Sequence, residues 1–250
     1  MFGLSFFKQK AVPIFVIGSG RSGTHLLGRV FSNRTDTTAF IEDKRFFKMV
    51  SHYATEYNRR DYTIDGIIKN YRKHFSKIQT PFILEKSHPN IWLVEPLAKA
   101  FPKAKFIGIH RGILATVNSM LQHPDIMLWY QLLDLNEPNA FLGITENNKT
   151  EFASWPPEVQ CACRVVAHRK RLMDLQARFP EKVMVLAYDD FYTKPTELMQ
   201  NLRNFLGYKT PLIPEPLHAN GLDKWQQELS AEQIQNIKAY LSELDLLNWL

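Results

Sequence analysis

The sequence contains little cysteine and no long apolar run. Its 250 residues include two cysteines, Cys161 and Cys163, which excludes a framework of several disulfides and favours a reducing compartment. No stretch approaches the roughly 18 apolar residues that a transmembrane helix needs. Lys8, Lys10 and Pro13 interrupt the apolar residues at the start, where a signal peptide needs an unbroken core. We therefore expect a cytoplasmic protein without a membrane span.

The sequence also lacks a long run of charge of one sign. The formal net charge is +6 and the pI is about 9.2, but the basic residues are spread along the chain. Basic and aromatic residues do not interleave on any one segment, so we expect no nucleic-acid partner. The hydrophobic fraction of 45% is typical of a globular protein, and the length predicts a single domain over residues 1–250. The positive charge therefore favours a small anionic ligand.

Short apolar segments alternate with longer helical patterns. Strands are expected at residues 11–17, 81–84, 105–109 and 182–187, and helices near residues 24–31, 90–101, 114–121 and 158–179. This alternation predicts an α/β fold, a P-loop-like parallel sheet with helices on both faces. Residues 123–157 have weak periodicity and scattered proline, asparagine and tryptophan, and we interpret them as an irregular or helical lid.

Residues 14–27, IFVIGSGRSGTHLL, place a glycine-rich turn between a predicted strand and a predicted helix. Gly18 and Gly23 have the spacing of a P-loop. However, Thr24 and His25 stand where such a loop carries lysine followed by serine or threonine. The turn therefore predicts anion binding of a kind that differs from that of a nucleoside triphosphatase.

The turn supplies several kinds of donor. Backbone N–H groups from Gly20 to His25 lead into a helix N-terminus and can surround an anion. Ser22 and Thr24 add hydroxyl groups, and Arg21 adds a permanent positive charge with a planar set of donors. We expect a phosphate or a related anion at this loop.

Polar residues follow the other predicted strands as well. Arg111 comes after the third strand, and Ser119 lies eight residues later, a little over two turns along the next helix. Ser119 can therefore face back toward Arg111, and the two side chains could hold a second phosphate. Because ligands of parallel sheets bind at the carboxyl ends of the strands, we expect these groups to converge on one crevice. The groups in question are residues 18–25, 85–88, 110–111 and 188–190.

Two segments, GRSGTHLL and HRGILATVNSML, together resemble the sulfotransferase superfamily, whose donor is 3′-phosphoadenosine 5′-phosphosulfate. In that family a [KR]-S-G-T loop holds the 5′-phosphosulfate, and an arginine followed eight residues later by a serine holds the 3′-phosphate. The segments FILEKSHPNIWLVEPLAKAFPKAKFIGIHRG and LAYDDFYTKPTELMQNLRNFLG resemble other family segments in the same order. The resemblance implies in-line transfer of a sulfonate group to an acceptor hydroxyl, without a metal ion.

The resemblance also assigns roles to individual residues. Arg21 would meet the charge that develops on the oxygen bridging phosphorus and sulfur, and Arg111 with Ser119 would hold the 3′-phosphate. The product would be adenosine 3′,5′-bisphosphate. The acceptor would be a small molecule or a glycan with a free hydroxyl, and residues 123–157 would lie on its side of the site.

Two candidates remain for the general base that takes the acceptor proton. His88 lies in Lys86-Ser87-His88, which resembles the Lys-Thr-His of cytosolic members, where the histidine is the base. Glu42 lies about where many bacterial and glycan-type members carry a catalytic carboxylate. We favour His88 and keep Glu42 as the alternative. Lys86 is expected near the transferred sulfonate.

One position departs from the cytosolic members, which place a tryptophan two residues after the threonine of the loop to stack on adenine. Leu26 occupies that position, and Tyr188 is the candidate that the resemblance offers for the adenine contact. Lys224, in Asp223-Lys224-Trp225, resembles a C-terminal segment of bacterial and glycan-type members. We therefore expect a relative of those members and count Lys224 among the donor-binding residues.

Two other functions compete with this interpretation. A P-loop kinase of nucleotides or small molecules needs a lysine after Gly23 and an aspartate for Mg²⁺, for which Asp189 or Asp190 is available. A catalytically inactive binding module is the second alternative. The basic residues 164–171 are interpreted as a solvated helix face, which an acidic acceptor could also use. His25 and His110 are interpreted as supporting residues, not metal ligands.

Overall fold

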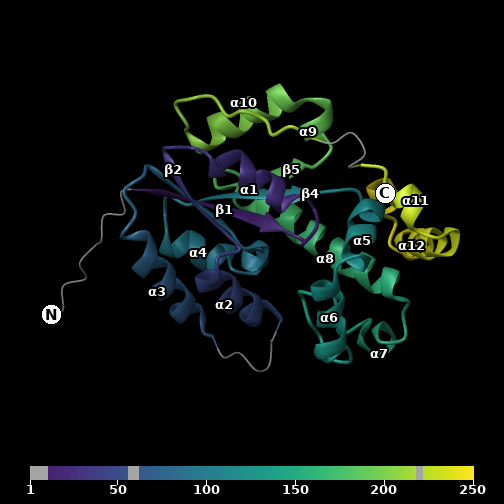
Figure 1. Ribbon diagram of the computed structural model, residues 1–250. Helices are drawn as coiled ribbons and strands as arrows, with labels where there is room; N and C mark the ends of the chain where they lie inside the picture. Colours follow the sequence, from purple (N-terminus) through teal and green to yellow (C-terminus); the bar gives the residue numbers. More distant parts are fainter. Residues whose placement is uncertain (1–10, 56–61, 218–221) are drawn as a thin grey trace.

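The structure, a computed structural model, describes residues 11–55, 62–217 and 222–250 of the chain (Figure 1). Residues 1–10, which include the interrupted N-terminal segment, lie outside the described residues. Five strands form one sheet in the order β2-β3-β1-β4-β5, and all neighbours pair in parallel. The strands are β1 Val12–Gly18, β2 Thr37–Ile41, β3 Phe82–Lys86, β4 Lys105–His110 and β5 Val183–Ala187.

Helices connect the strands. In chain order they are α1 Thr24–Ser32, α2 Lys44–Thr55, α3 Ile64–Phe75, η1 His88–Trp92, α4 Val94–Ala100, α5 Ile113–Leu121, α6 Pro124–Leu132, α7 Lys149–Phe152, α8 Pro157–Arg178, α9 Asp190–Thr193, α10 Pro195–Leu206, α11 Trp225–Glu228, α12 Ala231–Glu243 and η3 Leu247–Trp249. Thr63 caps α3 by accepting from the backbone N–H of Gly66. Ser230 and Gln233 form the capping box of α12, and Gly207 ends α10 at a φ of 78°.

Helices cover both faces of the sheet (Figure 1). Successive residues of a strand face opposite sides, so Ile14 and Val16 of β1 enter one core while Phe15 and Ile17 enter the other. Helices α1 and α10 cover the first face, and α2, α3, α4 and the C-terminal half of α8 cover the second. Strand β1 is therefore buried on both faces, with β3 and β4 on its two sides. The α/β fold with a parallel sheet is as the sequence predicts.

The sequence does not predict β2, α2 or α3. Strand β2 is an edge strand of five residues, TTAFI, in which two threonines replace the apolar residues of the other strands. Its pattern is therefore too short and too polar to be recognised, and its pairing with β3 decides its conformation.

Residues 123–157, which the sequence predicts as an irregular or helical lid, are helical in part. They contain α6 and α7, and Phe141, Leu142 and Phe152 are fully buried in a third core together with α5, α12 and the N-terminal half of α8. Residues far apart in the sequence supply this core, which is why no local pattern reveals it. Within the described residues, no helix is both long enough and apolar enough to cross a membrane.

Candidate active site

The turn between β1 and α1 is built on two left-handed backbone positions. Arg21 has a φ of 71° and Gly23 a φ of 103°. A side chain at Gly23 would bring its Cβ to 2.3 Å from Cδ2 of the Tyr188 ring, so only glycine fits. Helix α1 begins at Thr24, and the N–H groups of its first turn have no intrahelical partners. This geometry suits an anion held against the start of α1.

Ser22 holds the turn in place. Its buried hydroxyl donates to the carbonyl oxygens of Ser19, at 2.8 Å, and Ile109 at the end of β4, at 3.0 Å. Its backbone N–H also reaches Ser19 O at 3.4 Å. The sequence predicts that this hydroxyl serves as a donor to the ligand. In the structure it is already used by the fold, and it ties the turn to the neighbouring strand.

Arg21 brings the two sequence motifs together. Its Nε donates to Oγ of Ser119 on α5 at 3.0 Å, although the two residues are 98 positions apart. The Arg21 side chain is exposed, so its remaining donors face solvent at the rim of the turn. The turn and the helix after β4 therefore form one surface.

Three nitrogen-bearing side chains surround Glu42, which follows β2. Lys86 Nζ, at the end of β3, bonds Oε1 of Glu42. His88 Nδ1 lies 3.6 Å from the same oxygen, beyond hydrogen-bond distance, and His25 Nε2 lies 3.3 Å from Oε2. Sequence reasoning offers Glu42 and His88 as alternatives for one role, and the structure places both in one cluster. The parallel register of β1, β2 and β3 produces it, because their carboxyl ends meet at one edge.

The protonation states within this cluster follow from burial and neighbouring charge. Burial lowers the pKa of His88 to about 4, so its imidazole is neutral at pH 7. Burial also lowers the pKa of Lys86, against the effect of Glu42. Burial alone would raise the pKa of Glu42, but the neighbouring His25, His88 and Lys86 outweigh it and hold that pKa far below its ordinary value. Glu42 is therefore a firmly ionised carboxylate beside a neutral histidine.

A buried carboxyl supports the segment that carries Lys86 and His88. Glu85 Oε1 accepts from the Ser87 hydroxyl at 2.5 Å, and Oε2 accepts from Asn90 Nδ2 at 2.5 Å. Asn90 Nδ2 also donates to the hydroxyl of Tyr71 on α3 at 2.9 Å. Burial raises the pKa of Glu85 to about 7. This network, which sequence reasoning missed, fixes the turn from β3 into η1 and hence the position of His88.

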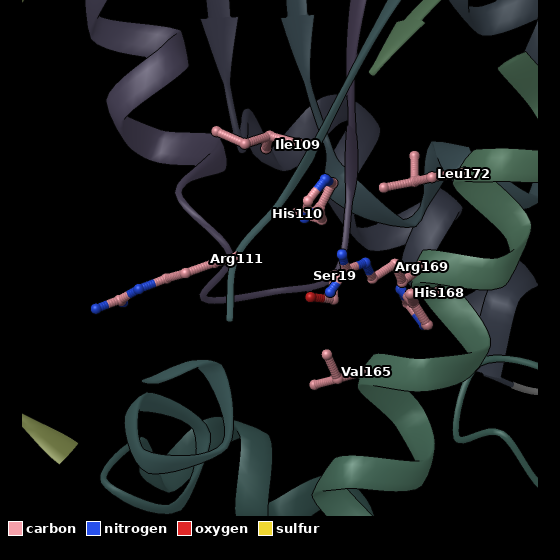
Figure 2. Close-up of a pocket in the computed structure, with 8 residues that line it drawn as sticks. All are labelled: Ser19, Ile109, His110, Arg111, Val165, His168, Arg169 and Leu172. Carbon is pink, nitrogen blue, oxygen red and sulfur yellow. The ribbon is translucent and has the colours of Figure 1, made fainter. Parts of the chain in front are cut away.

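His110 and Arg111 leave the end of β4 in different directions (Figure 2). Arg111 extends away from α8, and its guanidinium lies over the Tyr188 ring, 4.8 Å from the centroid. A cleft of about 200 Å³ opens beside this pair, between the ends of β4 and β5 and Trp249. His110, Arg111 and Arg169 also line a smaller cavity beside this cleft. Its other lining residues are Ser19, Ile109, Val165, His168 and Leu172. Burial lowers the pKa of His110 to about 4, so it is neutral there.

The matching family model covers residues 13–211 and describes a sulfotransferase family. This range contains the turn, the Glu42 cluster and the Arg111–Tyr188 pair. The chain belongs to the sulfotransferase family. No curated protein matches the sequence.

Solved structures of sulfotransferases share the fold. A sulfotransferase from Alicyclobacillus acidocaldarius is 16% identical to this chain, with a TM-score of 0.51. The alignment covers 92% of this chain and 95% of that protein. The sulfotransferase domain from the curacin biosynthetic pathway is 15% identical, with a TM-score of 0.52, and the alignment covers 93% of this chain and 98% of that domain. A mouse sulfotransferase complexed with PAP is 13% identical, with a TM-score of 0.52, and the alignment covers 93% of this chain and 84% of that protein. Family membership supports sulfotransferase activity, and these low identities show the fold alone.

In this sulfotransferase the predicted site residues are not all brought together. Lys224 is exposed at the start of α11, and the structure describes no contact between it and the turn. Helix α11 does pack against α5, where Glu228 accepts from Asn118 at 2.6 Å. Lys224 therefore lies on the element beside Ser119. Among the described residues, no group of three or more potential metal ligands is present.

Two of the five basic residues that the sequence predicts on a solvated face of α8 are buried. Arg164 and His168 are fully buried, and His168 contacts the carbonyl oxygens of Gly18 and Phe141 at 3.2 and 2.9 Å. Arg169 and Arg171 are half-buried, and Lys170 between them is exposed. The spacing offers a signal that was missed: Arg164, His168, Leu172 and Leu175 recur every three or four residues, which places them on the apolar stripe of the helix.

Proposed function

We propose that this sulfotransferase transfers a sulfonate group from 3′-phosphoadenosine 5′-phosphosulfate to the hydroxyl of a small molecule or a glycan. The observation that carries the proposal is the Arg21–Ser119 hydrogen bond, because it joins the loop motif to the helix motif on one surface. The structural neighbour complexed with PAP, the product of such a donor, supports the same donor here.

The donor side has a role for each of the predicted residues. The N–H groups of the turn, from Gly20 through Thr24 to His25, bind the 5′-phosphosulfate at the start of α1. Arg21 stabilises the charge on the bridging oxygen as it leaves, and such preorganised donors contribute on the order of 3 kcal/mol. Ser22 and Gly23 hold the shape of the turn.

The 3′-phosphate and the adenine lie farther along the same edge. Arg111 and Ser119 bind the 3′-phosphate, and the Tyr188 ring, already stacked under Arg111, forms a wall for adenine. The cleft beside Arg111 and Tyr188 lies at this position. Lys224, on the element packed against α5, adds positive charge.

His88 is the general base in this proposal. Its imidazole is neutral, and neither ring nitrogen has a hydrogen-bond partner among the described residues. Nδ1 faces Glu42, so we assign the ring proton to Nδ1 and the free lone pair to Nε2. Lys86 contacts the transferred sulfonate. Glu42, whose very low pKa makes it a weak base, fixes Lys86 and orients His88.

The reaction is an in-line displacement. The acceptor oxygen bonds to sulfur while the bond from sulfur to the bridging oxygen breaks, and the electron pair of that bond stays on the phosphate. The acceptor proton passes to Nε2 of His88. No metal ion takes part, since Arg21 and Lys86 neutralise the charge that Mg²⁺ meets in phosphoryl transfer.

Calorimetry tests the donor directly. The protein should bind adenosine 3′,5′-bisphosphate without Mg²⁺ and should bind ATP with Mg²⁺ weakly. Arg21→Gln should reduce bisphosphate affinity, whereas Lys170→Gln, on the exposed face of α8, should leave it unchanged. A preference for ATP with Mg²⁺ would assign the turn to a kinase, and binding of neither ligand would leave an inactive relative of the family.

A further inference from the structure

One arginine of α8 has no counterpart for its charge. The Arg164 side chain is fully buried, and its Nε, Nη1 and Nη2 atoms have no hydrogen-bond partner among the described residues. No carboxylate of the described residues forms an ion pair with it. Glu158, the buried carboxylate on the same helix, bonds instead to Asn236 at 2.9 Å.

Aromatic side chains enclose this guanidinium. Its central carbon lies 4.2 Å from the centroid of the Phe141 ring and 4.8 Å from that of Trp129. The buried hydroxyl of Tyr130 is a neighbour that also lacks a hydrogen-bond partner among the described residues, and no hydrogen bond of normal geometry joins it to Arg164. We call these four residues the aromatic cage: Trp129, Tyr130, Phe141 and Arg164.

The cage holds more hydrogen-bond donors than acceptors. Burying an unpaired charge is costly, and stacking the cation on an aromatic ring recovers only part of that cost. An arginine has five N–H donors and no acceptor, whereas the Tyr130 hydroxyl can donate one hydrogen bond and offers one acceptor oxygen. The chemical group that satisfies such a set is an anion with two or more oxygens, which a guanidinium binds through paired hydrogen bonds.

The cage lies next to the proposed base. Nη2 of Arg164 and Nε2 of His88 lie 3.6 Å and 3.4 Å from the same point, the position that a Cβ on Gly20 would occupy. The rings of Trp129 and Phe141 also lie beside His88, each with its centroid 6.3 Å from that of the imidazole. Three of the four cage residues, Trp129, Tyr130 and Phe141, belong to residues 123–157, the segment expected on the acceptor side of the site. Nδ1 of His88 faces Glu42, whereas Nε2 lies near Arg164. An anion at Arg164 is therefore assigned to the acceptor.

We propose that Arg164 and Tyr130 bind a carboxylate or similar anionic group of the acceptor, so that the substrate is a hydroxyl compound that itself carries negative charge. This inference rests on the proposed function and names the acceptor class. Trp129 is partly exposed while Tyr130 and Phe141 are buried, so the cage is nearest to solvent at Trp129.

Benzoate and benzamide test the site without requiring turnover. The two molecules have nearly the same shape, and only benzoate carries a carboxylate. Titrated calorimetrically into protein saturated with adenosine 3′,5′-bisphosphate, benzoate should bind at least about tenfold more tightly than benzamide. Equal affinities, or no binding of benzoate, would overturn the proposal.

Three variants locate the effect. Arg164→Gln should abolish the preference for benzoate, and Arg164→Lys should retain part of it because the charge remains. Lys170→Gln removes a charge from the exposed face of the same helix and should change nothing. A preference for benzoate that survives in Arg164→Gln would assign the anion to another group.

Bisphosphate binding separates the two proposals and monitors folding. If all variants bind the bisphosphate like the parent protein, the fold is intact and the benzoate result concerns Arg164 alone. If the parent protein does not bind bisphosphate, the proposed function fails, and the same benzoate titration on the protein alone still decides whether the cage binds anions.

Discussion

The turn after β1 and the aromatic cage each present an arginine to the same site, under opposite conditions. Arg21 is exposed, lies on a loop and donates to Ser119. Arg164 is fully buried, lies on a helix and has no partner among the described residues. An exposed arginine keeps its hydration, so its charge destabilises the fold little, and it can bind a ligand that arrives from solvent. A buried arginine without a partner loses that hydration, which costs several kcal/mol of folding free energy. Its presence therefore indicates a ligand that enters the protein interior.

The largest expected effect concerns His88, the proposed base, which lies near Arg164. His88→Ala should lower turnover by about 10²- to 10⁴-fold, the usual contribution of a general base, while bisphosphate affinity stays nearly unchanged. Initial rates with labelled donor and calorimetry measure the two quantities. An unchanged rate would transfer the role of base to Glu42, and Glu42→Gln is the comparison to make alongside.

The second prediction tests whether ligand binding at the turn requires the left-handed backbone conformation of Gly23. Gly23→Ala should weaken bisphosphate binding by at least about 100-fold, because left-handed strain and the collision with Tyr188 together cost about 3 kcal/mol. Gly207→Ala is the matched control, since Gly207 is also left-handed but has nothing within 4 Å of its Cβ position. It should cost about 1 kcal/mol of unfolding free energy and leave binding intact. If both variants bind alike, the turn is more adaptable than the structure indicates.

The third prediction concerns the network under His88. The pKa of Glu85 is raised from 4.5 to about 7, so the native state holds a proton that the unfolded state has lost between these values. The stability from this group is complete below pH 4.5 and is lost as the pH rises to about 7. The unfolding free energy of Glu85→Gln, relative to that of the parent protein, should therefore be higher at pH 8.5 than at pH 4.5 by about 3 kcal/mol, as measured with urea.

Glu95→Gln is the control of opposite sign. Burial would raise the pKa of Glu95, but Arg171 and Arg178 outweigh it and lower that pKa, so its contribution is present at neutral pH and is lost on acidification. The Glu95→Gln variant should be less stable than the parent protein at pH 7 and approach it at low pH. The same pH trend in both variants would contradict the assignment of Glu85.

The smallest effect is expected at Arg111. Arg111→Ala should weaken binding of adenosine 3′,5′-bisphosphate by about 10- to 30-fold, the value of a hydrogen bond to a charged group. Binding of adenosine 5′-phosphate, which lacks the 3′-phosphate, should change little. Equal losses for the two ligands would mean that Arg111 supports the Tyr188 ring and does not contact the 3′-phosphate.

The comparison of the two arginines also shows what the sequence can predict. Arg21 lies in a short motif whose function follows from local chemistry, and β1, β3, β4 and β5 are apolar runs that local pattern identifies. The Glu42 cluster was predicted as separate candidates, because the sheet order that joins them is not local information. The sequence predicts a solvated Arg164, because the rings that enclose this side chain lie 23 and 35 positions earlier in the chain.

The strand order has a consequence for how the chain reaches its native state. The β1 pairing with β4 joins Gly18 to Ile109, and the Ser22 hydroxyl needs the Ile109 carbonyl to hold the turn. A chain growing from the ribosome therefore carries the complete loop sequence long before β4 emerges to give the loop its shape. Such non-local pairing slows folding, and the turn is held in its native shape only after β4 has joined the sheet. If the proposed donor site is correct, adenosine 3′,5′-bisphosphate should stabilise the native state by binding this turn.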